Sequence, residues 1–189
     1  AKACAAVFEA LDQGKANALT KGIDAAGLKK ITRNWKLLDD GARLLLEDVL
    51  PRLDLPQDTM RTIISAHRTD CGLTASPEGI AHNPYILAET YCGESKDDRI
   101  PWSTVDRGVL PSPDLGGEPL AEMDGNDERR FRSLCVEHLR REPNHTFRLA
   151  QDLIVEIARR MQCRRRSESA LIRRREHFGL RGAGCPDSP

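Results

Sequence analysis

The feature that most constrains this chain is the spacing of its apolar residues, which recur at intervals of three and four along most of its length. The two clearest runs are Leu28, Ile31, Trp35 and Leu38, followed by Ala42, Leu45, Leu46 and Val49. This spacing places apolar side chains on one face of a helix. Aromatic residues make up only 4% of the chain, so the core must be largely aliphatic, which favours helix packing over a β-sandwich. We therefore expect a mainly α fold of stacked short helices, with at most a minor β element.

Prolines next to capping residues mark where several of these helices begin. The segment 55–58 predicts a helix with proline at its first position that continues to His67. Ser76–Pro77 and Asn83–Pro84 each predict a further helix, with a capping side chain before the proline. Residues 1–92 are therefore expected to form a string of short helices.

The rest of the chain divides into three segments. Residues 93–125 are rich in proline and glycine and have no sustained helical period, which predicts a long acidic loop with a β-like patch at most around 102–105. Trp102 and Asp106 in this segment are expected either to anchor it or to form a surface recognition patch. Residues 163–189 are expected to be an Arg-rich tail, partly disordered.

Residues 126–162 between these two segments predict a pair of amphipathic helices. Asp127 is the expected N-cap of the first helix, and Pro143 lies beyond its end. The apolar face predicted for this first helix comprises Phe131, Leu134, Cys135, His138 and Leu139.

The 29 basic residues cancel the 29 acidic ones, so total charge favours neither nucleic acid nor membrane nor an acidic substrate. The distribution is uneven. Residues 89–128 hold 3 basic and 11 acidic side chains, a net charge of −8, whereas residues 159–181 hold 9 and 2, a net charge of +7. Arginines such as Arg164, Arg165 and Arg166 suit bidentate phosphate contacts, although they could equally be solvated or pair with the acidic loop.

Several function classes lack their sequence signals. No apolar run approaches the roughly 18 to 20 residues of a membrane span, and residues 1–20 lack a leader pattern, so we expect a cytoplasmic protein without membrane contact. There is no phosphate loop, nucleophile motif or zinc motif, so we expect no catalytic residue and no cofactor in this chain. A metal or thiol site remains an alternative if four side chains converge, namely His67, Cys71, His82 and Cys92. The chain begins with Ala1 rather than Met, which fits a fragment of a longer reading frame or a processed product.

The sharpest local motif is the sequence TKGIDAAGLKKI at residues 20–31. A short helix (15–21) is expected to meet a glycine turn, and a second helix starts at once with two lysines. Such a hairpin directs free backbone N–H groups and a helix N-terminus outward, where a phosphate suits both. Asp24 stands at the second glycine position of the turn, where it tolerates a left-handed conformation but brings a carboxylate to the phosphate position. An ordinary helix–helix turn is the alternative interpretation.

The predicted contacts with the DNA backbone lie in this hairpin and in the Arg-rich tail. They are Lys21, Gly22, Ile23, Lys29, Lys30 and Arg33 in the hairpin, with Arg164, Arg165 and Arg166 as a second, looser contact.

This hairpin resembles the helix-hairpin-helix motif, which holds the nucleic-acid backbone without reading sequence. Together with HNPYILAE at 82–89, DERRFR at 127–132 and NHTF at 144–147, it makes residues 10–160 similar to the region that precedes the motor domains of RecD-like DNA helicases. The resemblance implies a fold of helix-hairpin-helix type and a non-catalytic DNA-binding accessory region of an ATP-dependent helicase, with a role in DNA repair. It also implies an ATPase motor in the same polypeptide if the chain is a fragment. A helical protein-interaction scaffold without nucleic-acid binding is the alternative.

Overall fold

The computed structural model describes residues 2–13, 22–93, 98–112, 117–121, 123–141 and 149–161. Within these ranges the chain is mainly helical and contains no strand, which confirms the predicted fold class. Three expectations lie outside the described residues: the short helix 15–21, the NHTF segment and the tail 163–189. None of the helices in the described part is long and apolar enough to cross a membrane.

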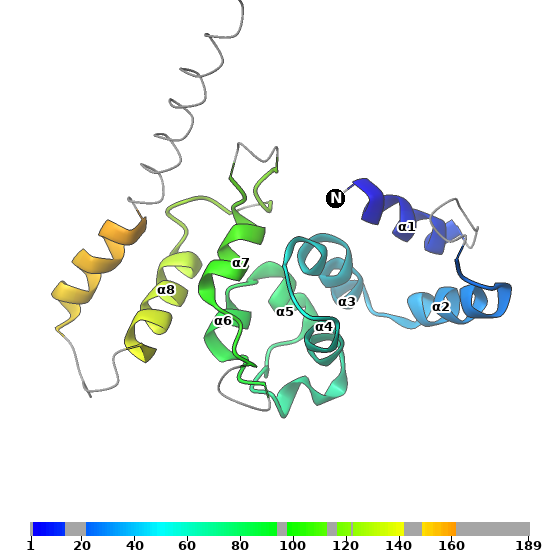
Figure 1. Cartoon of the computed structure of the whole chain (residues 1–189), viewed down its shortest axis with the longest axis horizontal. Coiled ribbons are helices and arrows are strands. Elements are labelled where there is room, and N and C mark those ends of the chain that lie inside the picture. Colours follow the sequence, from blue (N-terminus) through cyan, green and yellow to red (C-terminus); the bar gives the residue numbers. More distant parts are fainter. Residues whose placement is uncertain are drawn as a thin grey trace, which may run out of the picture.

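Figure 1 shows α1 and α2 lying to one side of the remaining helices. The helices in chain order are α1 (Lys2–Gln13), α2 (Ala25–Leu37), α3 (Asp40–Leu44), the π-helical turn η2 (Leu45–Val49), the 3-10 turn η3 (Leu50–Arg52), α4 (Gln57–Ile64), the 3-10 turn η4 (Ala66–Thr69), α5 (Pro77–His82), α6 (Ile86–Thr90), α7 (Trp102–Val109) and α8 (Glu128–Arg140). A further helix occupies residues 150–161. Helices α6, α7 and α8 pack on one another, and α3 packs on α5.

Side-chain caps start many of these helices where the sequence predicts them. Ser76 Oγ accepts a hydrogen bond from the Gly79 amide at 3.1 Å, and Pro77 is the first residue of α5. Asp127 caps α8 in the same way, accepting from the Arg129 amide at 2.8 Å. Each cap satisfies a donor that the first helical turn leaves free.

The predicted cap at Asn83 is wrong. Helix α6 starts only at Ile86, and the backbone carbonyl of Asn83, not its side chain, accepts from the Ile86 amide at 3.1 Å. The Asn83 Oδ1 atom is buried without a hydrogen-bond partner. Pro84 and Tyr85 form a turn before the helix, and the Ile86 amide that an Asn83 side-chain cap could bind is bound by the Asn83 carbonyl instead.

The predicted end of α4 is also wrong. Pro56 is the residue before the helix, and the helix ends at Ile64 rather than continuing to His67. Ser65 is extended, with φ −83° and ψ 167°, and its hydroxyl accepts from the His67 amide at 3.1 Å to begin η4. A serine side chain that bonds the local backbone competes with helix continuation, which explains the break.

Helix α7 corrects the expectation that residues 93–125 form one long loop with a β-like patch at 102–105. Val105 and Val109 are buried on one face of α7, and Trp102 lies one turn earlier. Gly108 permits close packing, because a Cβ there would lie 2.5 Å from Leu53 Cδ2. The surrounding prolines and glycines hid a short but regular helical period.

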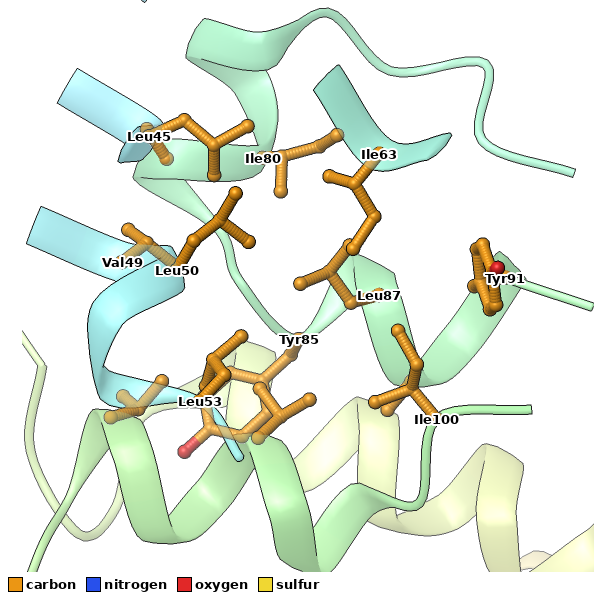
Figure 2. Close-up of a cluster of buried hydrophobic side chains, with 14 of the residues drawn as sticks. Leu45, Val49, Leu50, Leu53, Ile63, Ile80, Tyr85, Leu87, Tyr91 and Ile100 are labelled. Carbon is orange, nitrogen blue, oxygen red and sulfur yellow. The ribbon is translucent and has the colours of Figure 1, made fainter. Parts of the chain in front are cut away.

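The core is aliphatic with two tyrosines, as the low aromatic content predicted. Figure 2 shows side chains from η2, η3, α4, α5 and α6 pointing toward one another. Its labelled members are Leu45, Val49, Leu50, Leu53, Ile63, Ile80, Tyr85, Leu87, Tyr91 and Ile100.

The buried face of α8 differs in part from the predicted apolar stripe. Leu134 and His138 are buried as expected, but Leu139 is 45% exposed. Arg130 and Ser133 are buried instead. Polar partners on α6 and α7 explain this rotation and are described below.

Candidate nucleic-acid interface

Asp24 determines how α2 begins. Its backbone is extended, with φ −66° and ψ 162°, and its carboxylate accepts from the Gly27 amide at 2.7 Å. Asp24 therefore does not use the left-handed conformation that aspartate tolerates. Aspartate is one of the preferred N-caps, and its own carboxylate lies where an external phosphate would meet the helix N-terminus.

The opposite end of α2 is held against α1. Trp35 is buried, its Nε1 donates to Asp12 Oδ1 at 2.6 Å, and its ring stacks on Phe8 with centroids 5.0 Å apart. The Arg43 guanidinium lies 5.7 Å from the centre of the same ring. These contacts fix which face of α2 turns inward and thereby which face is left to solvent.

The outward face of α2 carries a row of cations. Lys29, Arg33 and Lys36 follow one another at intervals of four and three, so they share one side of the helix. They line a groove of about 650 Å³ together with Leu28, Leu37, Ala25 and Thr32. The groove therefore combines three positive charges with an apolar floor.

No carboxylate of the described residues forms an ion pair with these cations. Helix α2 contains four basic residues and no acidic one, and no ion pair links any of the four to the rest of the described chain. They are Lys29, Lys30, Arg33 and Lys36. Cations that lack internal partners remain available for an external anion.

The arginines of α8 are arranged differently, because acidic side chains of the protein hold them. Arg129 pairs with Asp127 at 2.6 Å, and Arg132 pairs with Glu89 at 2.8 Å. The hydrogen bond and charge of Glu89 raise the pKa of Arg132 above its ordinary value, whereas burial lowers that of Arg140. Arg132 thus attaches α8 to α6, whereas the cations of α2 form no ion pair with the rest of the described chain.

A buried ion pair joins α7 to α8. Asp106 is fully buried and accepts from Arg130 Nε at 2.7 Å and from the Tyr85 hydroxyl at 2.7 Å. Arg130 also donates to the Gly125 carbonyl at 2.8 Å, and its guanidinium lies 5.4 Å from the Trp102 ring centre. Of the two expectations for Trp102 and Asp106, the structure supports the anchor and not the recognition patch.

The predicted DNA-contact residues fall into four groups. Gly22 and Ile23 form the exposed turn before α2, and Lys29 and Arg33 line the groove. Lys30 is exposed on α2 outside the groove. Lys21, Arg164, Arg165 and Arg166 lie outside the described residues.

The sequence interpretation missed Lys36. Its signal was present, because Lys36 follows Lys29 by seven residues and Arg33 by three, which is the spacing of one helical face. The two lysines next to the hairpin drew attention to the helix start, whereas the cationic row runs along the whole length of α2.

The alternative of a metal or thiol site receives no support from the geometry. His67 contacts Asp70 at 3.3 Å and His82 lies 4.0 Å from Glu78, each within its own turn of helix. In the described ranges, no group of three or more histidine, cysteine, aspartate or glutamate side chains is placed to hold a metal ion.

No protein-family model matches the chain, and neither a curated protein nor a solved structure shows significant similarity to it.

Proposed function

We propose that this chain is a non-catalytic DNA-binding accessory region of a RecD-like ATP-dependent DNA helicase, and that α2 holds the DNA backbone. The observation that carries the proposal is the outward face of α2, where Lys29, Arg33 and Lys36 have no carboxylate partner among the described residues. Phosphate contacts require exposed cations that are not already paired within the protein. When such cations bind DNA, counterions are released from the DNA, and this release drives binding.

The spacing of the cationic row suits a phosphate backbone. Seven residues separate Lys29 from Lys36, which corresponds to about 10 Å along a helix that rises 1.5 Å per residue. A DNA strand carries one phosphate for roughly every 3.4 Å of duplex axis, so this row spans about three of them. Contacts of this kind position DNA without reading its sequence.

Helix α1 supports this function by holding α2 in place. Trp35 and its contacts with Phe8 and Asp12 join α2 to α1, so the cationic face has a defined orientation. The given sequence carries no phosphate loop, and ATP hydrolysis is assigned to a motor domain, in the same polypeptide if this chain is a fragment. Arg164, Arg165 and Arg166 provide the second, looser DNA contact, and the protein acts in the cytoplasm.

Charge reversal on α2 tests the proposal. We expect the triple variant K29E/R33E/K36E to bind fluorescent DNA at least about tenfold more weakly than the wild type at low salt, because three phosphate contacts become repulsions. The matched control is R61E/R107E/R159E, which changes the net charge equally at exposed arginines elsewhere. The control should bind within about twofold of the wild type. An equal loss in both variants, or no DNA binding by the wild type, would contradict the proposal.

One observation favours a second candidate, a protein-interaction scaffold. The helix at 150–161 and the residue before it expose three large apolar side chains, Leu149, Ile154 and Val155, with exposed fractions of 68%, 52% and 52%. A scaffold would retain its partner after nuclease treatment and would not need the α2 cations. Pull-down from nuclease-treated lysate by the wild type and by K29E/R33E/K36E separates the two functions.

A further inference from the structure

The groove on α2 contains more than phosphate-binding groups, and the apolar part of its lining has no role in the proposed function. Leu37 ends α2 with 75% of its surface exposed, and Leu28 lies partly buried in the same groove. Leu37 follows Arg33 by four residues, so the two side chains are neighbours on the surface of α2. A ligand that neutralises Arg33 would therefore lie close to the exposed Leu37 side chain.

We infer that the ligand of this groove is single-stranded DNA, with phosphates on the cations and unpaired bases on the leucines. The inference rests on the proposed function and names its substrate class. A duplex presents charged phosphates on its outside and keeps its bases paired within, so it would leave the leucine surface without an apolar partner. An unpaired strand can turn its bases outward and cover that surface.

The open shape of the groove agrees with this occupant. Its described lining comes from α2 alone, so the volume of about 650 Å³ is open to solvent along the helix, where an extended strand can lie. The row of Lys29, Arg33 and Lys36 then tracks the neighbouring phosphates along the strand. The cations therefore favour an anionic ligand, and the exposed Leu37 side chain favours an anion that also carries exposed bases.

The lining also indicates that the strand is held without sequence preference. Among the described lining residues, Thr32 offers the one uncharged side chain with hydrogen-bonding groups, which is too little to distinguish the edges of bases. None of these described residues is aromatic, so a base would contact aliphatic carbon rather than stack on a ring. Every base has a flat ring face that can lie on aliphatic carbon, so this contact would accept any base.

Leu37 provides the test, because its exposed position lets it change without disturbing the core. Binding of the full chain to a short fluorescent oligothymidylate and to a blunt duplex of equal length should be compared for the wild type, L37S and L37F. We expect the wild type to prefer oligothymidylate, L37S to weaken that binding roughly three- to tenfold, and L37F to strengthen it because a ring can stack on a base. Duplex binding should stay within about twofold for both variants.

A substitution at an equally exposed leucine is the control, and L149S fills this role because Leu149 is 68% exposed. It should leave binding of both probes unchanged. Equal affinity for the two probes and no effect of L37S or L37F would overturn this inference, while the proposed function would still stand if K29E/R33E/K36E weakened both. If the wild type binds neither probe at low salt, the proposed function fails together with the inference.

Discussion

Replacing Asp106 with alanine is the most informative perturbation of the fold. Asp106 is fully buried and receives three hydrogen bonds, from the Tyr85 hydroxyl at 2.7 Å and from Arg130 Nε and Nη2 at 2.7 and 3.2 Å. The variant D106A would leave the Arg130 guanidinium, with a side chain only 5% exposed, without its carboxylate. It would also leave the tyrosine hydroxyl without its acceptor.

The expected loss is large relative to total stability. Removing one partner of a buried ion pair costs about 3–5 kcal/mol, because the other charge remains buried and uncompensated. Domains of this size unfold with free energies of about 5–15 kcal/mol, so D106A should remove a substantial share. With about 2–4 °C of melting temperature per kcal/mol, Tm should fall by roughly 6–20 °C.

Urea denaturation followed by circular dichroism measures this loss. The control is E89A, which breaks a more exposed pair because the Arg132 side chain is 55% exposed, and it should cost only about 0.2–1 kcal/mol. The double variant D106L/R130M removes both charges and should recover most of the stability lost in D106A. If D106A lost no more than E89A, the claim that this buried pair attaches α8 to α7 would be refuted.

Three further predictions concern helix ends and carboxyl groups. D127A should lower stability by about 1 kcal/mol through loss of the α8 N-cap, measured by urea denaturation at pH 7. The side-chain hydrogen bond from Arg129 holds the pKa of Asp127 below its ordinary value. The stability that ionised Asp127 contributes is therefore present above about pH 5 and should be lost as pH falls through about 4 and below. If D127A were destabilised by the same amount at about pH 3 as at about pH 7, this cause would be contradicted. Burial, followed by the charge of Asp12, raises the pKa of Glu47, so folding becomes less favourable as pH rises from the ordinary glutamate range through this higher value. E47Q should therefore raise Tm at pH 7 more than at pH 4, and an equal effect at both would refute this cause. D24N keeps the α2 cap and removes a carboxylate near the cationic row, so it should strengthen DNA binding roughly 1.5- to 5-fold by anisotropy, whereas weaker binding would show that the charge of Asp24 assists the site.

The parts of the fold that the sequence predicted correctly depend on local chemistry. Ser76 and Asp127 cap helices because a hydroxyl or carboxylate can reach an amide two or three residues ahead, which sequence spacing alone encodes. The same local rules failed at Asn83, where the proline turn shifted the helix start, and at α7, where prolines and glycines hid a short apolar period.

The buried polar network could not be predicted because it depends on distant parts of the chain. Asp106 and Arg130 are 24 residues apart, and each belongs to a sequence segment whose charge pattern indicates an exposed surface. Only packing of α7 against α8 brings them together. At the candidate site, the sequence alone placed Lys36 on the same helical face as Lys29 and Arg33. Only the structure shows that no carboxylate of the described residues pairs with these three cations.

The salt dependence of DNA binding tests the central claim most directly, because it counts the phosphates that the protein neutralises. Affinity for a short oligothymidylate should be measured over a range of salt concentrations for the wild type and K29E/R33E/K36E. Each phosphate contact on a single strand contributes about −0.7 to the slope of log affinity against log salt, so losing three contacts should reduce its magnitude by about 2. A variant with the same slope as the wild type would show that α2 does not hold the DNA backbone.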